Sequence, residues 1–155
     1  MQQTPSIYSR LASLFPLGKS PVAPGTVATL AAGIPCFLLI GRFSWQIQSV
    51  LALALFLAGS YWAHVAEREL GRTDPQEVVI DELCGYLAAM VGHPVSFLSV
   101  MTGFVLFRAL DIWKPWPIRW VEKKVSGGIG VMLDDVLAGV FANILGLIIL
   151  KLAAG

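Results

Sequence analysis

Hydrophobic and polar positions divide this chain into long apolar runs separated by short polar segments. Residues 20–41 contain no Lys, Arg, Asp or Glu, and residues 43–66 form a second run of the same kind. Each run reaches the roughly 20 residues that a helix needs to cross a bilayer. Because only Arg42 separates them, the pattern predicts an antiparallel helical hairpin.

A third uncharged run, residues 83–107, is interrupted by Gly92 and Pro94. This interruption predicts two short helices, over 78–91 and 95–110. At about 1.5 Å per residue they reach only about 20–24 Å, less than the roughly 30 Å of a bilayer core. We therefore expect them to be re-entrant or shielded by their neighbours.

The last apolar run, residues 131–152, predicts one long helix that carries Asp134 and Asp135 near its start. Before it, the glycine-rich segment 121–130 is expected to be a flexible loop. Together the runs predict an all-α protein: a compact bundle of about five to six apolar helices in a single domain over residues 1–155.

Composition places this bundle in or at a membrane. Hydrophobic residues make up 56% of the chain and charged residues 14%, against about 25% in soluble domains. The mean hydropathy of +0.73 is typical of a polytopic membrane protein. No basic run suggests a nucleic-acid partner, and the two cysteines lack the spacing of a zinc site. The first twenty residues do not resemble a secretory signal, so we expect a mature, cytoplasmic N-terminus.

Alternate threading of the predicted helices gathers the polar segments at one end. Segments 18–26, 67–82 and 108–135 fall on one side, and the turns at 41–44 and 92–95 on the other. Nine Lys and Arg residues lie on the first side and two on the second. The positive-inside rule makes the first side cytoplasmic. Trp113, Trp116 and Trp120 are expected to be interfacial aromatic anchors.

Residues 74–85, DPQEVVIDELCG, hold four of the ten acidic residues of the chain. If this segment is helical, Asp74, Glu77 and Asp81 share one face. Alternatively, Asp74 caps a helix and Glu77 completes a capping box. Neither alternative accounts for both Asp81 and Glu82, because clustered acids near a membrane require a cation or a proton.

Several oxygen ligands and cations are predicted to converge at this end. Oxygen ligands without His or Cys favour Mg²⁺ or Mn²⁺ over zinc, and neighbouring cations suit a phosphate group. The acids are Asp81, Glu82, Asp111, Asp134 and Asp135, with Asp74 and Glu77 as further candidates, and the cations are Arg108, Lys114 and Lys19.

Two further features have both a functional and an ordinary explanation. The segment SPVAPGTVATL precedes a helix, with Thr26 as its expected N-cap, and could present N–H groups to an anion. An ordinary turn before a helix has the same sequence signature. His64, close to the polar end of its run, is either a general acid or base or a polar residue satisfied by packing.

Four motifs, in order along the chain, resemble those of the phosphatidylglycerophosphatase A family. They are APGT at 23–26, VVIDE–G at 78–85, FR–LDIWKPWPIRW at 107–120 and GGIGVMLDD–AG at 127–139. Cys84 departs from the apolar residue expected at its position.

The resemblance implies a small all-helical enzyme of the bacterial inner membrane with a cytoplasmic active site. Its substrate would be phosphatidylglycerophosphate in the phospholipid bilayer, hydrolysed to phosphatidylglycerol with Mg²⁺; no nucleic acid or protein partner is implied. By motif position, the resemblance assigns catalysis to Asp81, Glu82, Asp111 and Asp134, metal binding to Asp81, Glu82, Asp134 and Asp135, and phosphate binding to Arg108 and Lys114. Thr26, at the expected helix start, and Lys19, among the converging cations, are further phosphate-binding candidates from their positions in the chain.

Other classes of membrane protein fit less well. A transporter or ion-conducting protein would string acids through the membrane depth, whereas here they cluster at one end. A CDP-alcohol phosphotransferase would carry a DG–AR–G–D–D signature, which is absent. The motifs of aspartyl-phosphate, cysteine and vanadium-type phosphatases are also absent. Direct metal-assisted hydrolysis is the remaining hypothesis.

Overall fold

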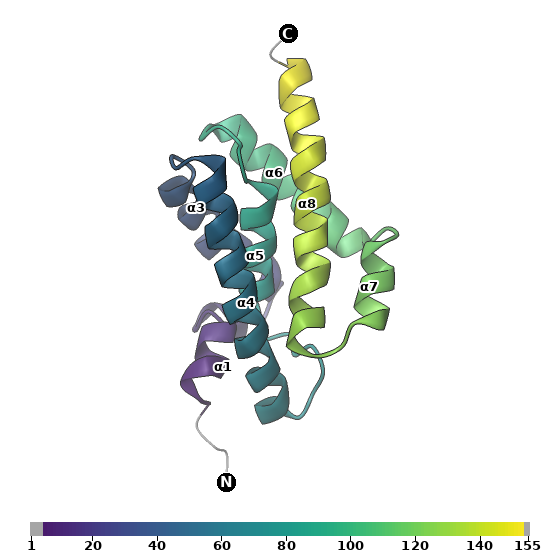
Figure 1. The fold of residues 1–155 in the computed structure, drawn as a ribbon. Coiled ribbons are helices and arrows are strands. Elements are labelled where there is room, and N and C mark those ends of the chain that lie inside the picture. Colours follow the sequence, from purple (N-terminus) through teal and green to yellow (C-terminus); the bar gives the residue numbers. More distant parts are fainter. Residues whose placement is uncertain (1–4, 154–155) are drawn as a thin grey trace.

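The structure is a computed structural model that describes residues 5–153, and within this range all regular elements are helical. The elements are α1 (Ile7–Ala12), the 3₁₀ turn η1 (Leu17–Lys19), α2 (Pro24–Ala28), the π turn η2 (Thr29–Gly33), α3 (Ile34–Ile40), α4 (Trp45–Leu70), α5 (Ile80–Ala89), α6 (Phe97–Trp113), α7 (Ile118–Lys124) and α8 (Gly127–Ala153). The all-α prediction is confirmed (Figure 1).

The first two apolar runs form the predicted pair of helices. α2, η2 and α3 follow one another without a break over residues 24–40, and the chain reverses at 41–44 into α4. Among residues 5–153, α4 and α8 are the helices both long and apolar enough to cross a membrane. Only 22% of the apolar window of each is buried inside the fold, so most of these side chains face outward.

α5 lies at the centre of the bundle, in contact with α4, α6 and α8. It is too short to cross a membrane, and eight of its ten residues are buried. A Cβ on Gly139 of α8 would overlap the carbonyl oxygen of Gly85, so these two helices cross in backbone contact. The predicted shielding of the short helix by its neighbours is therefore confirmed.

The turns opposite the acidic end meet through one side chain. The Gln48 amide nitrogen donates to the carbonyl oxygens of Gly41 and Phe43, at 3.3 and 2.8 Å. Its amide oxygen accepts from the backbone N–H of Gly92 at 3.0 Å. Both turns therefore lie at the same end, as the threading predicted.

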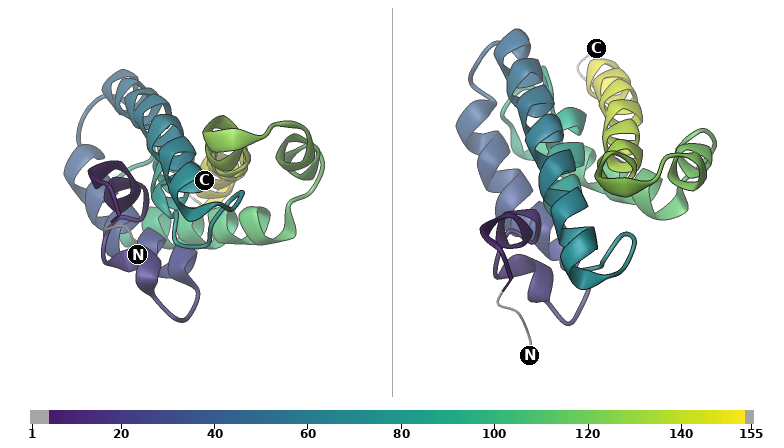
Figure 2. Two further views of the ribbon diagram at one scale, coloured as in Figure 1. Left: turned by 90° about the horizontal axis from the view of Figure 1, so that it is seen from below. Right: turned by 60° about the horizontal axis from the view of Figure 1, so that its bottom comes forward.

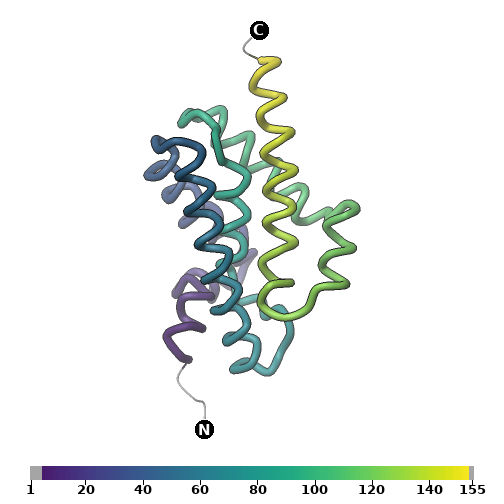
Figure 3. Tube along the Cα trace, in the orientation of Figure 1, coloured from purple at the N-terminus to yellow at the C-terminus, as the bar shows by residue number. Residues whose placement is uncertain are grey.

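The acidic stretch does not form one helix. Residues 71–79 are a loop, Asp74 has a φ of +47°, and α5 begins only at Ile80 (Figure 3). The shared-face and capping predictions for Asp74 are both wrong. Asp74 precedes Pro75, and the α conformation is disfavoured for a residue in that position. In addition, the N–H of Val79 donates to the carbonyl oxygen of Ala12 at 3.0 Å, which ties the loop to α1.

Two further local predictions are wrong. Thr26 lies inside α2, because Pro24 occupies the first helical position and Ala23 precedes it with a φ of +43°. The segment 121–130 is not a flexible loop, since it completes α7 and begins α8. A Cβ on Gly128 would lie 2.6 Å from the backbone nitrogen of His64, so the glycines allow α8 to pack directly on α4.

Candidate active site

A cavity of about 820 Å³ opens at the end of the bundle where the chain begins. Figure 2 views this end, with the N-terminal segment on one side of α4 and the α7–α8 segment on the other. The cavity is lined by the turn at 18–25, the loop at 74–79 and single faces of α5, α6 and α8. Segments far apart in the sequence therefore meet there, as the threading predicted.

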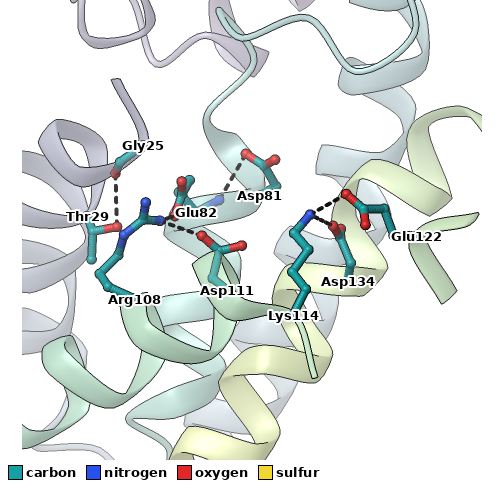
Figure 4. Close-up of polar contacts among 9 residues, drawn as sticks. All are labelled: Gly25, Thr29, Asp81, Glu82, Arg108, Asp111, Lys114, Glu122 and Asp134. Carbon is teal, nitrogen blue, oxygen red and sulfur yellow. Dashed lines mark hydrogen bonds and ion pairs between the residues drawn. The ribbon is translucent and has the colours of Figure 1, made fainter. Parts of the chain in front are cut away.

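Arg108 of α6 lies between two carboxylates in this cavity (Figure 4). Its Nη1 donates to Asp111 Oδ2 at 2.8 Å and also to Glu82 Oε2. The three side chains are only 11–14% exposed. The buried Arg108 Nε has no hydrogen-bond partner within residues 5–153. One guanidinium is thus shared by two acids, which leaves this group with a net negative charge.

The position of Glu82 depends on a glycine of the 23–26 motif. A Cβ on Gly25 would overlap the Glu82 carboxylate, at 2.6 Å from its Cδ. The buried Thr29 hydroxyl donates to the Gly25 carbonyl oxygen at 3.0 Å and holds this turn in place (Figure 4). Burial raises the pKa of Glu82 to about 7, although the neighbouring Arg108 lowers it.

Asp81 and Asp135 are buried acids of the cavity wall that make no ion pair within the described range. Asp81 Oδ1 accepts from the backbone N–H of Glu82 at 2.9 Å. Burial, and then the charge of Glu82, raise the pKa of Asp81 well above its usual value. Asp135 Oδ2, from α8, has no hydrogen-bond partner among the described residues. Such a pair requires a proton or a cation.

Lys114 and Asp134 form a separate cluster, outside the cavity lining (Figure 4). The Lys114 ammonium donates to Asp134 Oδ2 at 2.6 Å and to Glu122 Oε1 at 2.8 Å. Burial alone would lower the pKa of Lys114, but these two hydrogen bonds raise it overall. Glu122 was not anticipated from the sequence, because only the bend between α6 and α7 brings it back to Lys114.

The remaining predicted residues divide between the cavity and other sites. Lys19 lines the cavity, with its ammonium 4.9 Å from the centre of the Phe15 ring. Thr26 and His64 do not line it, and His64 lies instead against the start of α8. Of the two further acids, Asp74 and Glu77 both line the cavity, and Glu77 is paired with Arg72 at 2.7 Å.

The acids of the cavity provide oxygen donors of the kind that Mg²⁺ prefers. Within residues 5–153, no three His, Cys, Asp or Glu side chains come close enough together to hold an ion directly. The excess of buried carboxylate over cation and the unpartnered Asp135 Oδ2 nevertheless suit a hard cation. Mg²⁺ commonly keeps several water ligands, so two carboxylates are sufficient protein ligands. The residues present therefore fit Mg²⁺ bound partly through water.

Two known proteins with similar sequences carry the same name. A protein of Escherichia coli (strain K12) named phosphatidylglycerophosphatase A is 41% identical over 133 residues, which cover 85% of this chain and 77% of its own length. A protein of the same name from Haemophilus influenzae is 35% identical over 123 residues, 79% and 76% of the two chains.

A third relative, from Bacteroides thetaiotaomicron, is provisionally named a phosphatidylinositol-3-phosphatase. It is 38% identical over 137 residues, 84% of this chain and 86% of its own length. No solved structure matches the chain. The sequence profile of phosphatidylglycerophosphatase A matches residues 10–150. Because this match covers most of its length, the chain belongs to the phosphatidylglycerophosphatase A family.

Proposed function

We propose that this protein is a lipid phosphatase that hydrolyses the terminal phosphomonoester of phosphatidylglycerophosphate during phospholipid biosynthesis. Water oxygen bonds to phosphorus, the bond from phosphorus to the glycerol oxygen breaks, and phosphatidylglycerol and inorganic phosphate leave. The observation that carries the proposal is a cavity lined both by Arg108 and by the buried acids Asp81 and Asp135, in a chain of this family.

The cofactor in this proposal is Mg²⁺, with Asp81 and Asp135 as its candidate direct ligands and Glu82, next to Asp81, as a candidate ligand through bound water. Bound there, Mg²⁺ would polarise the phosphate and lower the pKa of water. Asp134 belongs to the ligand set only if its ion pair with Lys114 opens. Without such a change, Asp134 and Lys114 support the wall behind the cavity.

Two cations of the cavity, the exposed Lys19 and the more buried Arg108, are proposed to bind the phosphate. Lys19 is exposed at the cavity lining and makes no ion pair within residues 5–153, so it is free to attract an incoming phosphate. Arg108 lies deeper, and its bidentate geometry suits a phosphoryl group once a carboxylate releases it. Asp111 keeps Arg108 oriented while this exchange takes place. Charge at the phosphoryl oxygens is thereby stabilised.

The apolar outer surface of α4 and α8 supports a placement of the protein in the membrane. α4 and α8 are proposed to cross the inner membrane, with the cavity at their cytoplasmic end. All ten acidic residues lie between Glu67 and Asp135, in segments at that end. A phospholipid can then keep its acyl chains in the bilayer while its phosphate enters the cavity. The same distribution of acids gives no support to the ion-conducting alternative.

The direct test is phosphate release by purified protein in detergent micelles, with Mg²⁺ and with excess EDTA. Phosphatidylglycerophosphate and phosphatidylinositol 3-phosphate are compared as substrates, because the names of the relatives differ on this point. We expect metal-dependent release that is faster from phosphatidylglycerophosphate. Asp135→Asn should lower this release at least about a hundredfold, and Lys151→Gln, at the far end of α8, is the control. Release that is equal in EDTA, or absent from both lipids, would contradict the proposal.

A further inference from the structure

The bend between α6 and α7 exposes an unusual amount of aromatic surface. Trp113, Trp116 and Trp120 are 72%, 82% and 55% exposed. Figure 1 shows this bend projecting sideways from the bundle, beside the half of α8 that lies toward the cavity end. Three exposed tryptophans in one stretch of eight residues are rare on a water-facing surface and typical of a membrane interface.

The tryptophans surround a hollow of about 550 Å³ that is also basic. Arg119 and Lys123 line it, and neither forms an ion pair within residues 5–153. The third cation of the hollow, Lys114, is already neutralised by Glu122 and Asp134. In the part of the chain that the structure describes, no acidic side chain lines the hollow. It therefore presents two available positive charges framed by aromatic rings.

The hollow is held in shape by the fold. Arg119 Nη2 donates to the backbone carbonyl oxygen of Trp113 at 3.1 Å, which fixes the guanidinium across the bend. Buried Ile118 and Val121 hold α7 against α8. The side chains between these anchors must therefore face outward. An arginine with remaining free N–H groups beside tryptophans suits a phosphate at the level of lipid headgroups.

We infer that the hollow formed by Trp113, Trp116, Arg119, Trp120 and Lys123 binds the phosphodiester headgroup of an anionic phospholipid of the surrounding bilayer. This site is separate from the catalytic cavity, because the two share no lining residue. The inference rests on the membrane placement in the proposed function and does not require phosphatase activity. Bound lipid would fix the depth of the bend in the membrane and thus the height of the cavity above the lipid surface.

Lipid binding by the full chain in mixed micelles tests this inference. The bend contains three of the five tryptophans, so their fluorescence reports on lipid bound nearby. The probes are brominated phosphatidylglycerol and brominated phosphatidylcholine, which quench tryptophan on contact. We expect half-maximal quenching at a several-fold lower mole fraction of the anionic lipid. Each cation near an anionic lipid surface contributes about fivefold in binding, so the ceiling for the pair is about thirtyfold.

The matched variants are Arg119→Gln/Lys123→Gln and, at the opposite end of the molecule, Arg42→Gln. The double variant should lose the preference for phosphatidylglycerol, whereas Arg42→Gln should keep it. Lys123→Gln alone leaves the hydrogen bond to Trp113 intact, and its preference for phosphatidylglycerol should fall about fivefold. This variant separates loss of charge from distortion of the bend.

Wild-type protein without a preference, or a double variant that retains it, would overturn the inference. Reversal of the preference by excess inorganic phosphate would also overturn it, since the site would then bind the free anion. None of these readouts requires turnover, so a failure of the phosphatase assay is distinguishable from a failure of this site.

Discussion

Replacing Gly25 by alanine is a direct test of how the 23–26 motif supports the cavity. The new methyl group would overlap the Glu82 carboxylate, at 2.6 Å from Cδ and 3.2 Å from Cγ. The backbone of α2 cannot retreat easily, because Thr29 is fully buried and bonded to the Gly25 carbonyl oxygen. The Glu82 side chain must therefore rotate, and its ion pair with Arg108 is lost.

The loss of stability in Gly25→Ala depends on the contacts that Arg108 keeps. Removing one partner of a buried ion pair costs about 3–5 kcal/mol, but Arg108 keeps its contact with Asp111 at 2.8 Å. We therefore expect Gly25→Ala to destabilise the fold by about 1–2 kcal/mol, within the usual range of single substitutions. Displacement of a site group by about 1 Å costs about a hundredfold in rate, so kcat/KM should fall by about that factor.

The assay is steady-state phosphate release at saturating Mg²⁺, combined with thermal unfolding and helix content from circular dichroism. Glu82→Asp provides the matched partner, because its shorter side chain withdraws from the added methyl group. In a double-mutant cycle, the effects of Gly25→Ala and Glu82→Asp should be less than multiplicative. Near-normal kcat/KM for Gly25→Ala, or fully multiplicative effects, would refute the role of this contact.

Three further predictions concern the acids and their partners. Asp81→Asn and Asp135→Asn should each lower turnover at saturating Mg²⁺ at least about a hundredfold. The melting temperature of each variant in EDTA should be equal to or higher than that of wild type, because a buried unpaired charge is removed. Near-normal turnover would contradict the assignment of these two acids to the site. Lys114→Met should cost about 2–4 kcal/mol in chemical unfolding, because Asp134 is then left buried without a partner, and adding Asp134→Asn should recover most of this loss. The pKa of Glu82 is about 7 in the fold, above its ordinary value of 4.5, so the folded protein holds this proton more tightly than the unfolded chain does. The stability that Glu82 contributes to the metal-free protein is therefore full below pH 4.5 and is lost as the pH rises through 7. Melting in EDTA from pH 5 to 8 should therefore decline more steeply for wild type than for Glu82→Gln, and equal slopes would contradict the shift.

The helices were largely predictable from the sequence, because their signals are local. Uncharged runs of 22 and 24 residues, broken by Arg42, lead directly to the helix over 24–40 and to α4. Gly92 and Pro94 break the third run between α5 and α6, as predicted. These elements depend on periodicity, apolar length and helix-breaking residues, all of which are properties of neighbouring positions.

The errors fall where a distant contact overrides a local preference. The 74–79 loop satisfies the spacing of a helix, yet Val79 bonds to Ala12, more than sixty residues earlier. The glycines at 127–130 have the composition of a loop, yet they begin α8, because small residues permit its close approach to α4. Neither contact has a signal within its own segment.

The sequence by itself determined the helical class, the apolar belt and the gathering of acids and cations at one end, since these follow from residue types along the chain. Only the tertiary structure decided which side chains share a cavity. Asp134 and Asp135 are neighbours, but successive residues on a helix point about 100° apart, so Asp135 lines the cavity and Asp134 pairs with Lys114. Likewise, the fit of Gly25 against Glu82 joins positions 57 residues apart, and only the packing of α2 on α5 brings them into contact.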